Sequence, residues 1–284
     1  MSLLRRVSAA VLVAAMFGWL STLAPQDGEL RLTAAQNKAP AAGSEAPRAG
    51  SETPGTGDGA SAAGSEAPKP KPPPDCNKVK CVALTFDDGP TESTRELLDV
   101  LAARDVKATF FLVGRNVEKH PELVRREHRE GHELAGHSFT HADLGKSSKK
   151  KITSELSRTQ DAIRRATGAT PDLMRPPYGS TSKQLVKLAR EMGMAQVMWT
   201  VDPLDWRNRD SDAVERRVVK SVKPGSIVLL HDIHRTTVRA VPGIIDELKA
   251  EGYEFVTASE LFGGKLTPGK EYRELESGDG QGHP

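Results

Sequence analysis

The sequence predicts an α/β fold in which parallel strands are joined by helices. Short runs rich in apolar and β-branched residues alternate with stretches of helical periodicity between about Val79 and Phe262. Such alternation is typical of strand–helix–strand units built on a parallel sheet. Several helical stretches are followed by glycine, which readily adopts the left-handed conformation that ends a helix. Polar residues gather where the strand-like runs end, as expected for a functional site in this class of fold.

The expected elements follow from these patterns in chain order. The strand-like runs are Val82–Phe86, Ala108–Val113, Glu133–Ala135, Ala195–Val201 and Ile227–His231. The helical stretches are Thr94–Arg104, Pro121–Glu130, Ile152–Thr167, Ser182–Met192, Asp212–Val222 and Val241–Glu251. A segment of this length can bury one substantial core, so we expect a single domain over residues 76–263.

The first 25 residues resemble an export signal. Arg5 and Arg6 precede an uncharged apolar run from Val7 to Leu23, and a basic region before an apolar one is typical of a signal peptide. The run also has the length of a membrane anchor, which needs roughly 17–25 apolar residues. Both alternatives predict an exported domain that is periplasmic, attached to the cell envelope or secreted.

Residues 26–75 are predicted to be a disordered linker. They are dominated by Ala, Gly, Ser, Glu and Pro, and a short Ala-Gly-Ser-Glu motif recurs at Ala42, Ala49 and Ala63. Such a composition buries too little apolar surface to fold. Residues 264–284 are polar, Gly-rich and without periodicity, so they are predicted to be a flexible tail.

Net charge and cysteine content give further indications of binding partners and of the compartment. The formal net charge of +2 is the balance of many acids and bases, which implies no attraction to nucleic acid. The lysines of the stretch Lys146–Lys151 are expected to be a solvated loop and helix start, with polyanion binding as the alternative. Cys76 and Cys81 could form a disulfide in an oxidising compartment, although their spacing also allows two separate thiols.

The first motif with chemical potential is Thr85–Pro90, which reads TFDDGP. An apolar strand runs here into two adjacent carboxylates and a turn. In an extended backbone, Asp87 and Asp88 would point to opposite sides, so one could bind a metal while the other faces a reacting water. Asp-Asp-Gly before Pro is also an ordinary turn signal.

The second motif, HSFTH, places His137 and His141 four residues apart after a short strand. On a helical turn, both would share one face and could reach one ion. Neutral imidazole suits zinc and related divalent ions. Alone this spacing often marks a surface pair, but with a strand-end Asp it completes a two-His, one-carboxylate set with open coordination positions.

The third motif is RPPYG, from Arg175 to Gly179. Pro176 and its neighbour stiffen the backbone, and the peptide N–H of Tyr178 is free to donate to an oxyanion. Arg175 could clamp a carboxylate and lower its pKa. A Pro-rich connection with a surface arginine is the alternative.

Two further motifs end the series, DPLDW at Asp202–Trp206 and LLHD at Leu229–Asp232. The first brings two carboxylates, Asp202 and Asp205, and an indole after a strand. The second ends a very apolar strand with His231, and a histidine at such a position is as often structural as catalytic. Trp206 and Leu229 could equally be core residues.

In chain order, these five segments resemble the motifs of the carbohydrate esterase family 4 polysaccharide deacetylases, also called the NodB-homology group. The resemblance covers about Val79 to Leu261. It implies a distorted (β/α) barrel and a metal-dependent hydrolase that removes N-acetyl groups. It also implies one divalent ion, for which zinc is expected and cobalt, nickel and manganese are alternatives.

The resemblance implies a role for each site residue. The catalytic residues would be Asp87 (general base), His231 (general acid), Arg175 (orienting Asp87), Tyr178 (oxyanion N–H) and Asp205. The metal ligands would be Asp88, His137 and His141. Trp206 and Leu229 would line the acetyl pocket, and Pro176 and Asp202 would also bind substrate. The sequence leaves open whether Asp202 or Asp205 tunes His231 or Arg175.

The expected substrate is a GlcNAc-containing polysaccharide, either peptidoglycan or chitin-like oligomers, with acetate as product and a monomer as the working form. Export and a linker that holds the domain away from a membrane or wall favour peptidoglycan. One alternative is an O-acetyl esterase acting on xylan with the same site. Another is a wall-binding module that keeps the site without turnover.

Overall fold

The computed structural model describes residues 72–275. The predicted signal or anchor (1–25) lies outside the described residues, as does nearly all of the predicted linker (26–75). Among the helices that the structure describes, none has the length and apolar character needed to span a membrane.

The described residues form one eight-stranded sheet in the order β6-β1-β2-β3-β4-β5-β8, with β7 pairing to β1. The strands are β1 (Cys81–Asp87), β2 (Thr109–Leu112), β3 (Glu133–Gly136), β4 (Leu173–Met174), β5 (Ala195–Val197), β6 (Ser226–His231), β7 (Glu254–Phe255) and β8 (Glu271–Tyr272). Every strand pair is parallel, as the alternation of elements predicts.

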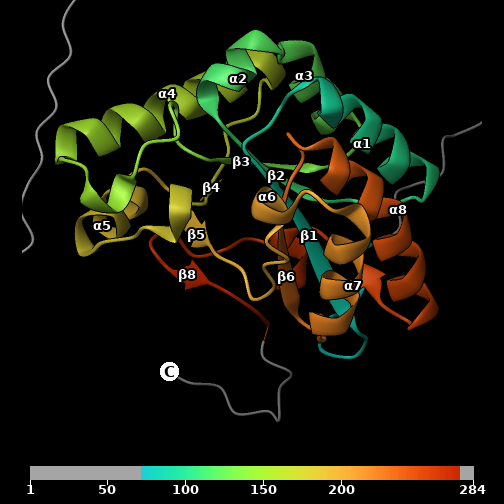
Figure 1. Cartoon of the computed structure of the whole chain (residues 1–284). Coiled ribbons are helices and arrows are strands. Elements are labelled where there is room, and N and C mark those ends of the chain that lie inside the picture. The colour runs from blue at the N-terminus through green and yellow to red at the C-terminus, as the bar shows by residue number, and fades with distance from the viewer. Residues whose placement is uncertain (1–71, 276–284) are drawn as a thin grey trace, which may run out of the picture. The chain divides into compact units, whose positions relative to one another are not determined.

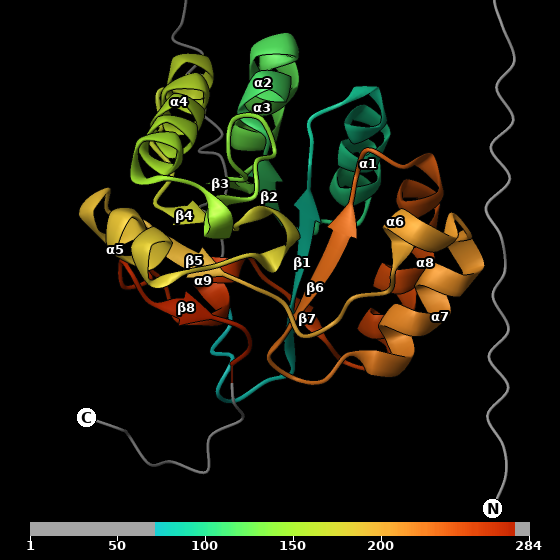
Figure 2. The same ribbon diagram turned by 60° about the vertical axis from the view of Figure 1, so that its left-hand side comes forward.

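Strand β1 lies at the centre of the fold, and Figure 2 shows it beside β6 and pointing the same way. All of its residues are buried, as expected for a strand of a parallel sheet with side chains covered on both faces. Its register with β6 places Asp87 opposite His231. Its register with β2 places Asp87 opposite Phe111.

The sheet curls so that its far part returns to β6. Val201 forms an isolated bridge with Val228, and Ser226 forms another with Glu274. The Leu229 N–H donates to the Val201 carbonyl at 2.9 Å. These short bridges join the two ends of the strand order into a distorted (β/α) barrel, which confirms the predicted fold class.

The helices surround this sheet. They are α1 (Glu92–Ala103), α2 (Gly114–Lys119), α3 (Pro121–Arg129), α4 (Lys149–Thr167), α5 (Lys183–Glu191), α6 (Asp205–Asn208), α7 (Ser211–Ser221), α8 (Arg235–Ala250) and α9 (Ala258–Leu261). In Figure 1, α4, α2 and α3 run along the top of the view, and α7 and α8 lie on its right. The buried faces of α1, α7 and α8 pack with β1, β2 and β6 in one apolar cluster.

Three boundary predictions are wrong. Strand β5 ends at Val197 rather than Val201, because Met198 N–H donates to Tyr272 of β8 while Thr200 and Val201 donate to Ile227. Helix α8 begins at Arg235, before the predicted start at Val241, and carries Pro242 in its interior. The predicted tail from residue 264 contains strand β8, which pairs with β5, so its described part, residues 264–275, belongs to the fold.

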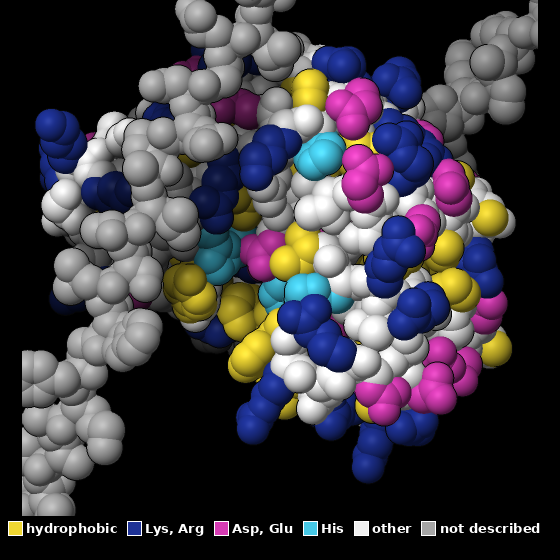
Figure 3. Space-filling model, turned by 45° about the horizontal axis from the view of Figure 1, so that its top comes forward, with side chains coloured by type: hydrophobic (Ala, Val, Ile, Leu, Met, Phe, Trp, Pro, Cys, Tyr) yellow, Lys and Arg dark blue, Asp and Glu magenta, His cyan; other side chains and the backbone are white. Residues whose placement is uncertain are grey.

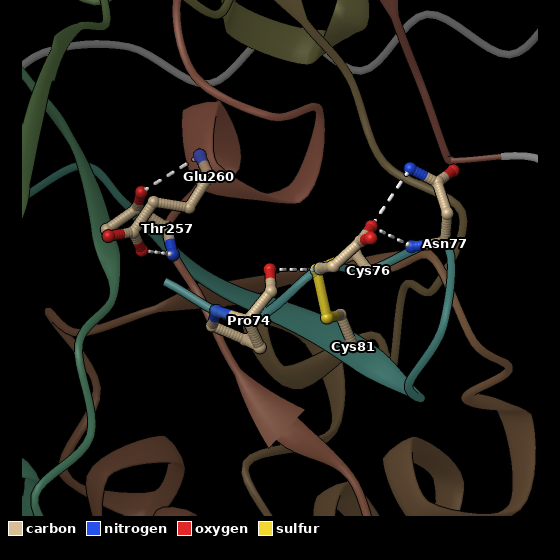
Figure 4. Close-up of a disulfide and its surroundings, with 7 residues drawn as sticks. Pro74, Cys76, Asn77, Cys81, Thr257 and Glu260 are labelled. Atoms are coloured by element: carbon tan, nitrogen blue, oxygen red, sulfur yellow. Dashed lines mark hydrogen bonds between the residues drawn. A yellow bond between two sulfur atoms is a disulfide. The ribbon is translucent and has the colours of Figure 1, made fainter. Parts of the chain in front are cut away.

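The two cysteines form a disulfide between Cys76 and Cys81 (Figure 4), with Cα atoms 5.4 Å apart. Cys81 is the first residue of β1. The bond therefore ties the chain that enters the domain to the beginning of the central strand, at the end opposite to Asp87.

Candidate metal and catalytic site

A cavity of about 420 Å³ opens at the carboxyl ends of the strands. Figure 3 shows histidine, acidic and hydrophobic side chains gathered on this face of the molecule. The lining residues are Asp87, Asp88, His137, His141, Pro176, Tyr178, Trp199, Asp202, Trp206, Leu229 and His231. Ten of the twelve predicted site residues therefore line one cavity, and the other two, Arg175 and Asp205, are fully buried.

Asp88, His137 and His141 converge on one point. One ligand atom from each lies within 4.8 Å of the others. Oδ1 of Asp88 is 3.1 Å from Nε2 of His141 and 3.5 Å from Nε2 of His137. The arrangement offers two imidazole nitrogens and one carboxylate oxygen, a set that holds zinc or a related divalent ion while leaving positions open.

The outer nitrogens of both histidines have partners that orient the rings. His137 Nδ1 lies 2.7 Å from the Arg175 carbonyl, and His141 Nδ1 lies 3.1 Å from the Tyr178 hydroxyl. Because a carbonyl can only accept, His137 carries its proton on Nδ1 and directs the Nε2 lone pair toward Asp88. Burial also lowers the pKa of His137, which keeps the ring neutral, as a metal ligand must be.

The residues fit a cation. Burial by itself raises the pKa of Asp88, but the neighbouring His141 and His137 outweigh it and lower the pKa to about 2. Oδ1 of Asp88 is buried and has no hydrogen-bond partner among the described residues, with Nε2 of His141 3.1 Å away. A buried, ionised oxygen beside two imidazole nitrogens is satisfied by a bound positive ion.

Asp87 is held by Arg175 beneath the cavity. Nη1 of Arg175 donates to Oδ1 of Asp87 at 2.7 Å and to the Thr85 hydroxyl at 2.8 Å. Nε and Nη2 of the same guanidinium donate to the carbonyls of Val197 and Met198, respectively. These bonds fix the carboxylate of Asp87 with Oδ2 3.7 Å from His137 Nε2. The predicted clamp between Arg175 and Asp87 is therefore present.

His231 is paired with Asp205. Its Nδ1 lies 2.9 Å from Oδ1 of Asp205, and Oδ2 accepts from the His231 N–H and the Thr237 hydroxyl, each at 2.8 Å. Burial by itself lowers the pKa of His231, but the hydrogen bond and charge of Asp205, with the charges of Asp87 and Asp88, raise it to about 9. The ring is therefore protonated at neutral pH.

Asp202 does not take part in the pairing with His231. It is exposed, and its Oδ1 accepts the Leu204 N–H at 2.8 Å. It lines the cavity without a hydrogen bond to His231 or Arg175 in the described residues. Of the two carboxylates, Asp205 is thus the one that contacts His231, and neither has a hydrogen bond to Arg175 among the described residues.

Tyr178 stands at the rim with 71% of its surface exposed and a left-handed φ of 62°. Among the described residues, its backbone N–H has no hydrogen-bond acceptor, so it remains free to donate into the cavity. Leu229 is buried with 5% exposure and Trp206 is 48% exposed. Both line the cavity, so the interpretation of these residues as ordinary core is wrong for Trp206.

Two local predictions are wrong in geometry. Asp88 has a left-handed φ of 74°, so the two carboxylates do not point to opposite sides, and both approach Nε2 of His137. The HSFTH segment is not a helical turn. Ser138 and His141 have φ values of 58° and 60°, and these two residues bend the loop so that both rings face Asp88.

Two residues that line or support the site were missed from the sequence. Trp199 lines the cavity, whereas the sequence predicts it inside the strand Ala195–Val201. Glu155 accepts hydrogen bonds from the loop between the two histidines. The only sequence signal for Glu155 is its place on the apolar face of α4, beside buried Ile152, Leu156 and Thr159.

Comparisons with known proteins agree with this geometry. Residues 75–197 match the family model for polysaccharide deacetylase. The chain is 44% identical over 200 residues to the peptidoglycan-N-acetylglucosamine deacetylase PgdA of Listeria monocytogenes serotype 1/2a (strain 10403S), covering 70% of this chain and 42% of the relative. It therefore spans less than half the length of that relative.

Two further matches extend over nearly the whole of the other chain. The chitooligosaccharide deacetylase of Bradyrhizobium sp. (strain ANU 289) is 38% identical over 203 residues, covering 66% of this chain and 93% of the relative. The solved structure of the T48 deacetylase with substrate is 43% identical, with a TM-score of 0.67, and the match covers 70% of this chain and 98% of that one. Together with the converging motifs, these matches show that the chain belongs to the polysaccharide deacetylase family, the NodB-homology group of carbohydrate esterase family 4.

Proposed function

We propose that this chain hydrolyses the N-acetyl groups of a GlcNAc-containing polysaccharide, with cell-wall peptidoglycan as the substrate and acetate as a product. One observation carries the proposal. Asp87 and His231 are register partners on neighbouring parallel strands, and both line the cavity that contains Asp88, His137 and His141. A base and an acid thus face the same small space beside a candidate metal site.

The cavity walls suit an acetylated sugar. Leu229, Trp199 and Trp206 contribute apolar surface, against which an acetyl methyl group and the face of a pyranose ring can pack. Trp206 is half exposed, so it is accessible to a polymer lying across the opening.

A divalent ion at Asp88, His137 and His141, for which zinc is expected and cobalt, nickel or manganese are alternatives, would supply Lewis acidity to the carbonyl and the attacking water. Asp87 accepts the proton of the water as it attacks the acetyl carbon. Arg175 holds the Asp87 carboxylate in a fixed orientation through the bond at 2.7 Å. The N–H of Tyr178 donates to the oxyanion that develops on the former carbonyl oxygen.

His231 completes the reaction as general acid. An amide nitrogen leaves poorly as an anion, so a proton must reach it as the carbon–nitrogen bond breaks. His231 carries that proton at neutral pH because its pKa is raised to about 9. Asp205, fully buried, orients the ring and stabilises its charge in both the resting and the reacting state.

The names of two relatives indicate different polymer substrates. The Listeria relative is named for peptidoglycan N-acetylglucosamine and the Bradyrhizobium relative for chitooligosaccharide. The apolar run after Arg5 and Arg6, as a signal or anchor, would bring the enzyme to the cell envelope, which favours peptidoglycan. We propose a monomer as the working form, since all the residues assigned to the site come from one chain.

Mass spectrometry tests this proposal directly. The metal-loaded protein is incubated with digested peptidoglycan, chitin oligomers and acetylated xylan. Loss of about 42 mass units, the change when one acetyl group is hydrolysed, is scored on each. The same attack on the acyl carbon is expected for all three substrates. Deacetylation of peptidoglycan fragments above the other two is expected. Activity on acetylxylan alone would assign an O-acetyl esterase, and no activity on any substrate would favour a wall-binding module.

A further inference from the structure

The loop that carries the two histidines has a backbone shape that needs outside support. It runs from His137 to His141, and two of its residues, Ser138 and His141, occupy the left-handed region. Residues other than glycine adopt this region only when their surroundings hold them there. The spacing between the histidine nitrogens therefore depends on what holds the loop.

Glu155 of helix α4 holds the middle of this loop. Its Oε2 accepts the backbone N–H of Phe139 at 2.8 Å and that of Thr140 at 2.7 Å. Its Oε1 accepts the Thr140 hydroxyl at 2.9 Å and pairs with Lys151 at 2.7 Å. Glu155 is only 2% exposed, so a single buried carboxylate satisfies two consecutive loop N–H groups and one side chain.

The other side of the loop is held by backbone groups. The N–H groups of Gly114 and Arg115, at the beginning of α2, donate to the carbonyls of Ser138 and Phe139, each at 3.0 Å. The loop is thus clamped between α2, which binds its carbonyls, and Glu155, which binds its N–H groups. Only the second half of this clamp depends on a side chain and can be removed by substitution.

We propose that Glu155 is a positioning residue that sets the affinity of the site for its divalent ion by holding Phe139 and Thr140, so that His137 and His141 face one point. The proposal rests on the metal site described above. Glu155 itself touches neither the ion position nor the substrate cavity. Its removal frees the loop to leave the left-handed conformations and separates the two histidine nitrogens.

Metal binding in the full-length chain tests this role without reference to turnover. Cobalt(II) is titrated into the metal-free protein, and its visible absorption reports both affinity and coordination. Glu155→Ala is expected to weaken binding about 10- to 100-fold, the usual effect of removing a group that orients a metal ligand. Wild-type affinity in a folded Glu155→Ala protein would overturn the proposal.

Two conservative variants separate positioning from general stability. Glu155→Asp keeps the charge but is one methylene too short to reach both N–H groups, so it is expected to fold and to bind cobalt more weakly than the wild type. Unchanged affinity in this variant also overturns the proposal, even if Glu155→Ala does not fold. Glu155→Gln keeps an oxygen acceptor for the two N–H groups and is expected to recover most of the affinity, whereas weakness equal to Glu155→Ala would contradict the hydrogen-bonding role.

A matched control lies on the same helix. Ile163 is fully buried two turns beyond Glu155, so Ile163→Ala should lower the melting temperature without changing cobalt affinity below it. Equal loss of affinity in this control would show that any damage to α4 has the same effect and would overturn the specific role of Glu155. A wild-type protein that does not bind cobalt at all would instead contradict the proposed metal site.

Discussion

Arg175 Nη1 lies 2.7 Å from Asp87 Oδ1, with both side chains almost completely removed from solvent. The other hydrogen bonds of this guanidinium go to the Thr85 hydroxyl and to the carbonyls of Val197 and Met198. One buried cation therefore connects β1 to the chain around the end of β5 and fixes the carboxylate proposed as the base.

Replacing this cation should destabilise the fold strongly. Arg175→Met leaves Asp87 as an unpaired buried charge, and breaking a buried pair in this way costs about 3–5 kcal/mol. Chemical unfolding measures the loss. Arg104→Met is the control, because Arg104 pairs with Asp246 at the surface and should lose less than about 1 kcal/mol. Equal losses for the two variants would contradict the structural role given to Arg175.

Asp87 and His137 should fail in different ways. Asp87→Asn keeps an oxygen that can accept from Arg175, so the protein should fold and bind metal but lose about 10²- to 10⁴-fold in turnover for lack of a base. His137→Ala removes a metal ligand and should lose both metal and activity. Competition with a chromogenic chelator measures the metal, and acetate release measures turnover. Near-normal deacetylation by Asp87→Asn would refute the assignment of the base.

The alkaline limb of the pH–rate profile should report His231. The acid must be protonated, so the rate falls as pH rises through its pKa, which Asp205 and the nearby carboxylates raise to about 9. Asp205→Asn removes the charge that favours the imidazolium, and the limb should therefore move to lower pH. Asp202→Asn should leave it in place, because Asp202 has no hydrogen bond to His231 in the described residues. An identical shift in both variants would show that negative charge around the cavity opening, rather than the pairing with Asp205, sets the pKa of His231.

Glu127 should limit stability rather than support it. This residue of α3 is fully buried, and neither carboxylate oxygen has a hydrogen-bond partner among the described residues. Burial, with a smaller effect from Asp232, raises its pKa well above the usual range. Such a group favours the folded state below its ordinary pKa of 4.5, and this advantage is lost as pH rises through the folded value.

Glu127→Met should therefore raise the free energy of unfolding by about 1–3 kcal/mol, since it replaces an unsatisfied polar group with an apolar one of similar length. The gain should be larger at pH 8 than at pH 5, because the buried Glu127 carboxyl favours the folded state less as pH rises. Glu96→Met, at an exposed position of α1, serves as the control and should change stability by less than about 0.5 kcal/mol. A destabilised Glu127→Met protein would show that the carboxyl group has a stabilising partner after all.

Reduction of the disulfide should lower stability and spare activity. Cys76 and Cys81 are separated by only 5 positions, and closing so short a loop contributes about 2 kcal/mol through the unfolded chain. The melting temperature should fall by roughly 4–8 °C for a domain of this size. The rate at 25 °C should not change, because Cys81 begins β1 and Asp87 ends it. A matching loss of activity would mean that the bond also shapes the site.

Much of the architecture was predictable because strands and helices leave different periodicities in the sequence. The predicted bounds of strands β1, β2, β3 and β6 lie within a residue or two of the observed ones. The strands β4, β7 and β8, each two residues long, were not predicted. Two residues carry no periodicity, so their pairing depends on neighbours brought by the rest of the chain.

The same division holds in the site. Motif order identified Asp87, Asp88, His137, His141 and His231, because strand ends of a parallel sheet meet at one edge. The shapes of the loops were not predictable. The left-handed conformations of Asp88, Ser138 and His141 are unfavourable locally and persist only because tertiary contacts, including those of Glu155, hold them.

The sequence by itself determined which chemical groups are available and which edge of the sheet they occupy, since both follow from residue type and from the alternation of strands and helices. Only the tertiary structure decided that Asp205 rather than Asp202 pairs with His231 and that Glu155 supports the histidine loop. These choices depend on contacts between segments distant in the chain. Hydrogen bonds of 2.7–2.9 Å form only between groups that folding brings to that distance. The local sequence does not predict which distant segments will approach so closely.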